Sequence, residues 1–117
     1  MRPGPAESIL RSVQRSYAII WRHGDGPMYA GRFEFTEGGV RIHGSAPERQ
    51  ARVYDIPLAE IRGAAIARER ADRLRGLATM ILGLDRSAPF AIATLDGPGR
   101  LAELVSAVAV RTSKEAA

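Results

Sequence analysis

Few residues in this chain have the types and spacing that catalysis or metal binding requires. The 117-residue sequence contains no cysteine and two histidines, His23 and His43. A thiolate nucleophile and a cysteine-based zinc site are therefore excluded. Asp25 follows His23 closely, but a general base also needs an oriented partner and a substrate pocket, and the sequence indicates neither. No serine lies in a Gly-x-Ser-x-Gly motif. We expect no catalytic residue and no metal ligand.

A glycine-rich motif at residues 97–102 has the G-x-G-x-x-A pattern of a dinucleotide-binding loop. It reads Gly-Pro-Gly-Arg-Leu-Ala, and it stands between an expected strand and an expected helix. Such a loop lets a pyrophosphate approach the N-terminus of the helix. The complete site also needs a following parallel strand and an acidic residue about 20 residues further on. The sequence offers neither, so we expect a turn into a helix and no bound cofactor.

The densest run of charge lies in residues 68–75. Its cations are Arg68, Arg70, Arg73 and Arg75. Glu69 and Asp72 lie between them, so four arginines less two acids leave a charge of +2. A solvated loop is the simpler interpretation. The alternative is a contact patch for an anionic membrane surface, a nucleic acid or an acidic protein. No aromatic residue lies among the arginines, which argues against nucleic acid as the partner.

The last two expected strands, residues 77–84 and 89–95, are apolar on both faces. A sheet with one face in water should carry polar residues at alternate positions. Either a helix of the same chain or a second chain is therefore expected to cover the outer face. Antiparallel pairing would merge one face of each strand into a single patch. The candidate interface residues are Met80, Leu82, Leu84, Ala91, Ala93 and Leu95.

Alternation of apolar and polar residues predicts the strands that would position these side chains. In residues 28–36, Tyr29 and Phe33 share one face, while Arg32 and Glu34 share the other. The expected strands are residues 17–22, 28–36, 40–43, 50–56, 62–69, 77–84 and 89–95. Residues 44–49 and 70–75 are expected to be loops, and residues 58–61 one helical turn. Because the connections are short, neighbouring strands should be antiparallel.

Residues 98–111 have the pattern of an amphipathic helix. Leucine and valine recur there at the spacing that places them on one stripe facing a core. The stripe residues are Leu101, Leu104, Val105 and Val108. Residues 1–16 are expected to form a tail followed by a short helix from Ala6, and residues 112–117 a frayed tail.

Two segments carry a resemblance to a known fold. Residues 30–40 read Ala-Gly-Arg-Phe-Glu-Phe-Thr-Glu-Gly-Gly-Val, and residues 54–61 read Tyr-Asp-Ile-Pro-Leu-Ala-Glu-Ile. Both are similar to segments of the pleckstrin-homology (PH)-like superfold, especially its GRAM and bacterial PH-like branches. The resemblance spans residues 17–111. It implies a mainly β domain, a seven-stranded antiparallel barrel or sandwich capped by a C-terminal α-helix. It also implies a binding or scaffolding module rather than an enzyme.

The lipid site of that superfold is a pattern of basic residues across the first hairpin. The corresponding region here offers Arg22, His23 and Arg32. It lacks the closing pair of basic residues, and Asp25 lies in the loop. We therefore do not expect phosphoinositide binding by that route.

Composition supports an ordinary globular domain, since 45% of the residues are hydrophobic and 26% are charged. No apolar run approaches the ~18 residues of a membrane span, and the N-terminus shows no secretory signal. We expect a cytoplasmic, non-catalytic module that mediates protein–protein interaction or self-association. Attachment to an anionic membrane surface through the arginine-rich loop is the first alternative, and a small-molecule-binding barrel is the second.

Overall fold

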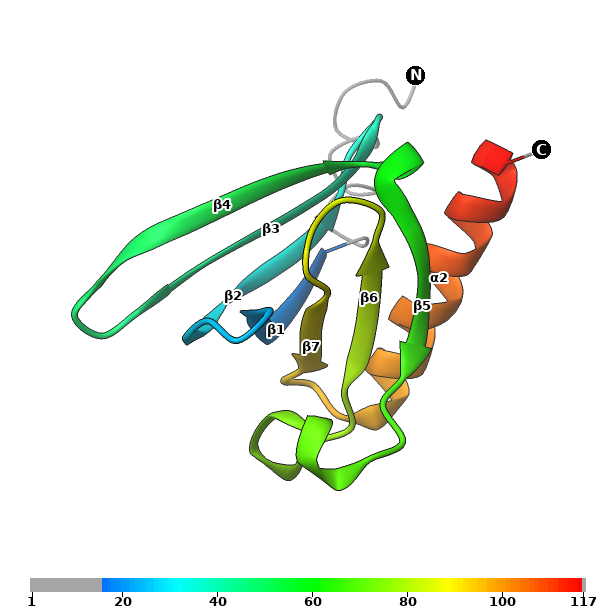
Figure 1. The fold of residues 1–117 in the computed structure, drawn as a ribbon. Helices are drawn as coiled ribbons and strands as arrows, with labels where there is room; N and C mark the ends of the chain where they lie inside the picture. Colours follow the sequence, from blue (N-terminus) through cyan, green and yellow to red (C-terminus); the bar gives the residue numbers. More distant parts are fainter. Residues whose placement is uncertain (1–15, 117) are drawn as a thin grey trace, which may run out of the picture.

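The computed structural model describes residues 16–116. The expected N-terminal tail and short helix lie outside the described residues, apart from Ser16, which opens the first strand. The expectation of a mainly β domain is confirmed, because seven antiparallel strands form one curled sheet that is followed by a C-terminal helix (Figure 1). Among the described residues, no helix is both long and apolar enough to cross a bilayer.

The strands follow one another along the chain with short connections. They are β1 (Ser16–His23), β2 (Met28–Phe35), β3 (Gly39–Ala46), β4 (Arg49–Pro57), β5 (Ile61–Ile66), β6 (Met80–Leu84) and β7 (Phe90–Thr94). Their order in the sheet is β4-β3-β2-β1-β7-β6-β5, so β4 and β5 are its two edges. A 3₁₀ turn, η1 (Leu58–Glu60), joins these two edges at one corner. The sheet therefore curls into a half-barrel that stays open between β4 and β5.

The main core lies on the concave face of the sheet. Its largest fully buried side chains include Trp21 on β1, Phe33 on β2 and Phe90 on β7. Phe33 occupies the inward position that the alternation in residues 28–36 predicts. Helix α2 (Pro98–Ala116) closes one end of this core. It buries the expected stripe of Leu101, Leu104 and Val108, with Val105 partly buried beside them.

Two arginines fix α2 to the β1–β3 part of the sheet. Near its start, the guanidinium of Arg100 lies 4.5 Å from the ring centroid of Tyr17. Further along, Arg111 donates a 2.8 Å hydrogen bond to the carbonyl oxygen of Thr36 at the end of β2. The apolar stripe lies between these two contacts along the helix and packs towards β5 and η1.

Several boundaries differ from those expected. Strand β3 continues through residues 44–46, where we expected a loop, and a tight turn at Pro47 and Glu48 leads into β4. Glu48 adopts a φ of 62°, the left-handed conformation that such short hairpin turns require. Helix α2 runs to Ala116, through most of the segment 112–117 that we expected to fray. Thr112 supports this extension by donating a 3.0 Å hydrogen bond to the carbonyl of Val108.

The prediction that the six candidate interface residues form a single patch is wrong, because the strand register places them on different faces. Met80 pairs with Ile92 and Leu82 pairs with Phe90, so these four side chains share the concave face. Met80 and Leu82 are fully buried there, and Leu84 is half-buried against the same core. Ala91 and Ala93 occupy the alternate positions that face the convex side, and Leu95 lies in the turn after β7.

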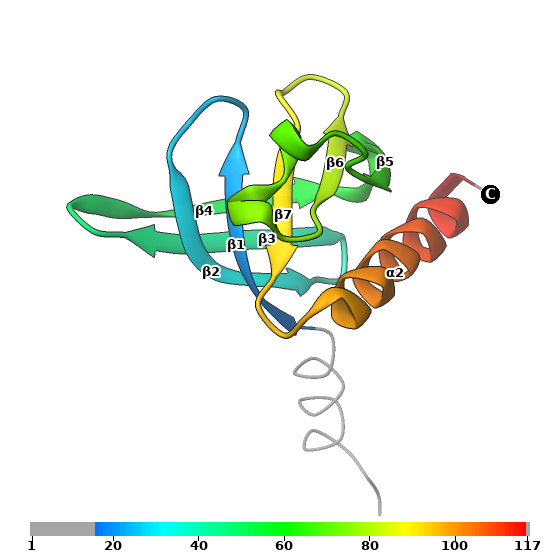
Figure 2. The same cartoon turned by 90° about the horizontal axis from the view of Figure 1, so that it is seen from below.

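A segment of the chain itself covers the convex face of β7 and β1. Residues 67–79, between β5 and β6, fold back as two 3₁₀ turns, η2 (Arg70–Asp72) and η3 (Leu74–Gly76) (Figure 2). Leu74 is 3% exposed and packs with Ile20 and Ala93 in a second hydrophobic cluster. This segment replaces the simple charged loop expected at residues 70–75, and it explains why the last strands are apolar on both faces.

A buried threonine holds the covering segment in place. Thr79 Oγ1 accepts a 2.9 Å hydrogen bond from the backbone N–H of Leu74 and donates a 2.9 Å bond to the carbonyl of Leu77. The backbone of Thr79 also accepts a 2.7 Å bond from the N–H of Ala67. Both ends of the segment are thus tied to one fully buried residue.

Replacing Leu74 should therefore expose the convex face. Leu74→Ala should lower the free energy of unfolding by about 2 kcal/mol or more, because it removes a buried side chain and leaves a cavity beside Ile20 and Ala93. Thermal melting measures this loss. Leu77→Ala is the matched control, since Leu77 lies in the same segment and is 41% exposed. Equal melting temperatures for the two variants would contradict the covering role of Leu74.

Candidate binding site beside the open edge of the half-barrel

Strand β4 presents a free edge next to the concave face. The β3–β4 hairpin extends well beyond the rest of the sheet (Figure 1). Residues 49–53 of β4 are all exposed, and Val53 is 60% exposed. A strand at the end of a sheet directs backbone N–H and C=O groups outward, without a strand partner. The described residues place no strand along this side of β4.

Aromatic side chains line the concave face beside this edge. Trp21 stacks on Tyr29 with ring centroids 4.7 Å apart. Tyr54 on β4 and Phe90 on β7 meet edge to face at 5.1 Å. His23 lies flat against Phe90, with centroids 4.3 Å apart and an interplanar angle of 8°. Ring pairs at such distances are favourable and hold one another in place.

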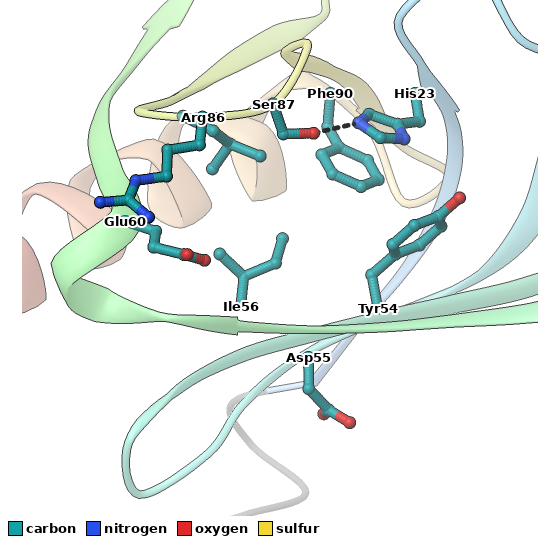
Figure 3. Close-up of a pocket in the computed structure, with 9 residues that line it drawn as sticks. His23, Tyr54, Asp55, Ile56, Glu60, Arg86, Ser87 and Phe90 are labelled. Atoms are coloured by element: carbon teal, nitrogen blue, oxygen red, sulfur yellow. Dashed lines mark hydrogen bonds between the residues drawn. The ribbon is translucent and has the colours of Figure 1, made fainter.

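Two adjoining clefts follow from this arrangement, and they share His23 and Tyr54. The first has a volume of about 170 Å³ and lies between β4 and the β6–β7 turn (Figure 3). Its lining includes Ile56, Leu84 and Phe90, with Glu60, Arg86 and Ser87 at its rim. The second has a volume of about 180 Å³ and lies between Trp21, Tyr29 and Arg52.

A pair of glycines makes room for the tryptophan in this wall. Gly31 on β2 and Gly44 on β3 are register partners. The indole N–H of Trp21 passes across them and donates a 3.0 Å hydrogen bond to the carbonyl of His43. A Cβ on Gly44 would lie 2.8 Å from the indole nitrogen and 2.7 Å from the carbonyl oxygen of Ala30. The position of Trp21 therefore depends on glycine at Gly44.

Charged side chains around the clefts differ in whether they are paired. Arg41 Nε donates a 2.7 Å hydrogen bond to Asp55 Oδ1 on the convex side, and this hydrogen bond raises the pKa of Arg41. Arg52 is the only charged residue in the lining of the second cleft. Within residues 16–116, Arg52 has no ion-pair partner, and its neighbour across the ladder is Gly44. Its guanidinium is therefore available to a ligand.

One polar contact in the first cleft has the form of a nucleophile and a base. His23 Nε2 and Ser87 Oγ are 2.8 Å apart. Reaction as an acyl-transfer pair would also need a group to orient the imidazole and donors for an oxyanion. The described residues place no carboxylate in hydrogen-bond contact with His23. They also contain no cluster of three or more potential metal ligands. The Ser87 contact orients the imidazole of His23 at the mouth of the first cleft.

The sequence-based candidates fall in four different places. His23 lies at the clefts, whereas His43 lies on β3 with its Nε2 3.3 Å from a Glu34 carboxylate oxygen. The motif at residues 97–102 forms the expected turn into α2, with Gly97 at a φ of 105°. Arg68, Arg70, Arg73 and Arg75 are all exposed on the segment that covers the convex face.

Tyr54, Phe90 and Arg86 were not among the candidates. They come from strands and turns far apart in the sequence, so no local motif joins them. The signal that was present is the pairing of aromatic residues with glycines in β1–β3, which indicates close approach across the sheet.

Comparisons with protein families, with curated proteins and with solved structures find no match to this chain.

Replacing Gly44 tests the tryptophan site. Gly44→Ala should cost about 1–3 kcal/mol of stability, because the new methyl group overlaps the indole and a strand backbone. It should also alter the fluorescence spectrum of Trp21, which is the sole tryptophan. Gly38→Ala serves as the control, since its Cβ would meet nothing within 4 Å. An unchanged spectrum and melting temperature in Gly44→Ala would contradict the described packing.

Proposed function

We propose that this chain is a non-catalytic, PH-like protein-binding module that takes an extended segment of a partner protein along β4. The observation that carries the proposal is a cleft the size of one side chain directly beside a free strand edge. Strand addition uses these two features together. Main-chain hydrogen bonds supply affinity, and pockets for alternate side chains supply specificity.

The volume of the clefts favours a side chain over a small-molecule ligand. Drug-sized ligands occupy pockets of about 300–1,000 Å³. A cavity of about 150 Å³ is enough for one benzene ring. The first cleft, at about 170 Å³, therefore fits a single ring or branched aliphatic group. This supports a peptide ligand rather than the small-molecule-binding barrel.

The charge of β4 favours a different protein over a second copy of the chain. Arg49 and Arg52 both lie on the exposed half of the strand, and residues 49–53 contain no acid. Antiparallel pairing of two β4 edges would bring these arginines together, and like charges on facing strands are destabilising. Self-association through this edge is thus disfavoured.

Peptide selection followed by NMR mapping tests the proposal. Random peptides displayed on phage would be selected on the immobilised domain, and the selected peptides titrated into ¹⁵N-labelled protein. We expect amide shifts concentrated in β4 and in the residues around the two clefts. The other free edge, β5, is the internal control. Shifts confined to β5 or α2, or failure to select any binder, would overturn the proposal.

A second candidate function rests on the arginines of the covering segment. Arg68, Arg70, Arg73 and Arg75 are exposed, and the residues that the structure describes offer none of them an ion-pair partner. Leu74 holds the segment that carries them against the sheet. A fixed cluster of cations is suited to an anionic membrane surface, where each arginine contributes about 1 kcal/mol.

Vesicle sedimentation tests this second function. Binding to phosphatidylserine-containing vesicles should fall roughly 10-fold or more when Arg70, Arg73 and Arg75 are all changed to glutamine. The matched control changes Arg49, Arg52 and Arg86 to glutamine, which removes the same charge elsewhere. Equal losses in both triple variants would indicate attraction by net charge alone. Absence of binding at low ionic strength would exclude the membrane function.

A further inference from the structure

The concave face of β4 presents three side chains in a row. Arg52, Tyr54 and Ile56 face inward, because their ladder partners on β3 are the inward residues Gly44, Ile42 and Val40. Successive residues on one face of a strand are about 6.6–6.8 Å apart. A segment paired with β4 would place its own alternate side chains at the same spacing on that face. Each partner side chain therefore meets a different environment.

One of these environments accepts an aromatic ring. Opposite Tyr54 and Ile56 the partner side chain enters the first cleft, whose walls include Phe90 and Leu84. The rings of His23, Tyr54 and Phe90 already contact one another, which leaves their faces and edges fixed around the opening. Offset and edge-to-face contacts to such a wall favour an aromatic side chain over an aliphatic one.

The neighbouring environment accepts a carboxylate. Opposite Arg52 the partner side chain meets a guanidinium that has no ion pair within residues 16–116. Asp25 lies in the nearby β1–β2 turn, but it is exposed and does not line the cleft. Asp55 points to the convex side and is engaged by Arg41. An arginine binds a carboxylate with two parallel hydrogen bonds, which fixes position as well as charge.

We propose that the segment bound along β4 carries an acidic residue and an aromatic residue two positions apart, the acid against Arg52 and the ring in the first cleft. This inference rests on the proposed strand addition and names its substrate class. The two-residue spacing follows because alternate residues of a strand lie on the same face. A separation of three would turn the acid to the convex face, where Val53 and the paired Asp55 lie.

Synthetic peptides test the spacing and the charge. The parent peptides have an alternating Thr-Val frame with Glu and Phe two positions apart, in both orders, because strand direction is free. Their variants change Glu to Gln, Glu to Lys or Phe to Ala, or move Glu to three positions from Phe. Trp21 fluorescence reports binding, and amide shifts locate it. We expect one parent order to bind at β4 and each variant to bind about three-fold more weakly or worse.

A charge exchange in the protein separates recognition from folding. Arg52→Glu should bind the Lys peptide better than the Glu peptide, which a merely destabilised protein would not do. Arg49→Glu is the matched control, since it makes the same change of charge at the start of the same strand, and it should keep the preference for Glu. Thermal melting confirms that both variants are folded.

The outcomes distinguish the inference from the function on which it rests. If the Glu, Gln and Lys peptides bind β4 equally, or if the three-residue spacing binds as well as the parent, the acid–aromatic pattern is wrong and strand addition stands. If peptides selected at random shift only residues outside β4, strand addition is wrong and this inference falls with it.

Discussion

The hydrogen bond from Trp21 to the carbonyl of His43 is the constraint on which the rest of the concave face depends. It crosses from β1 over β2 to β3, and the glycine pair Gly31 and Gly44 leaves the space for it. The indole would otherwise be a buried donor without a partner, which is costly in a dry core. With the indole fixed, the aromatic rings on β1, β4 and β7 pack around it, and the open side of the half-barrel acquires an aromatic wall.

A sheet of this size gains stability from both of its faces. Small domains bury a low fraction of their surface, so each additional cluster matters. The concave face carries the main core and α2, whereas the covering segment adds a second cluster around Leu74, Ile20 and Ala93. The same segment contains the four exposed arginines, whose side chains lie on its solvent side. A stabilising element and a charged surface are therefore parts of one loop, and the sequence alone shows only the charges.

Local patterns predicted most strands and the final helix, because the alternation in β2 and the helical spacing in α2 are each visible within one short segment. The sequence did not show the register in which neighbouring strands pair. Met80 and Ala91 were assigned to one face, yet the register pairs Met80 with Ile92, and one residue of offset reverses every side chain. The clefts were beyond prediction for a related reason, since Tyr54 and Phe90 meet only when the sheet curls.

Helix α2 also determines how the domain can deform. Arg100 and Arg111 tie it to β1 and to the end of β2, while its apolar stripe packs towards β5 and η1. The helix thus braces the two halves of the sheet against each other at one end. Among the described residues, no helix lies against the far end of the β3–β4 hairpin (Figure 1). The proposed strand addition would therefore begin at the hairpin end, which α2 does not contact, and advance towards the corner at η1 that α2 supports.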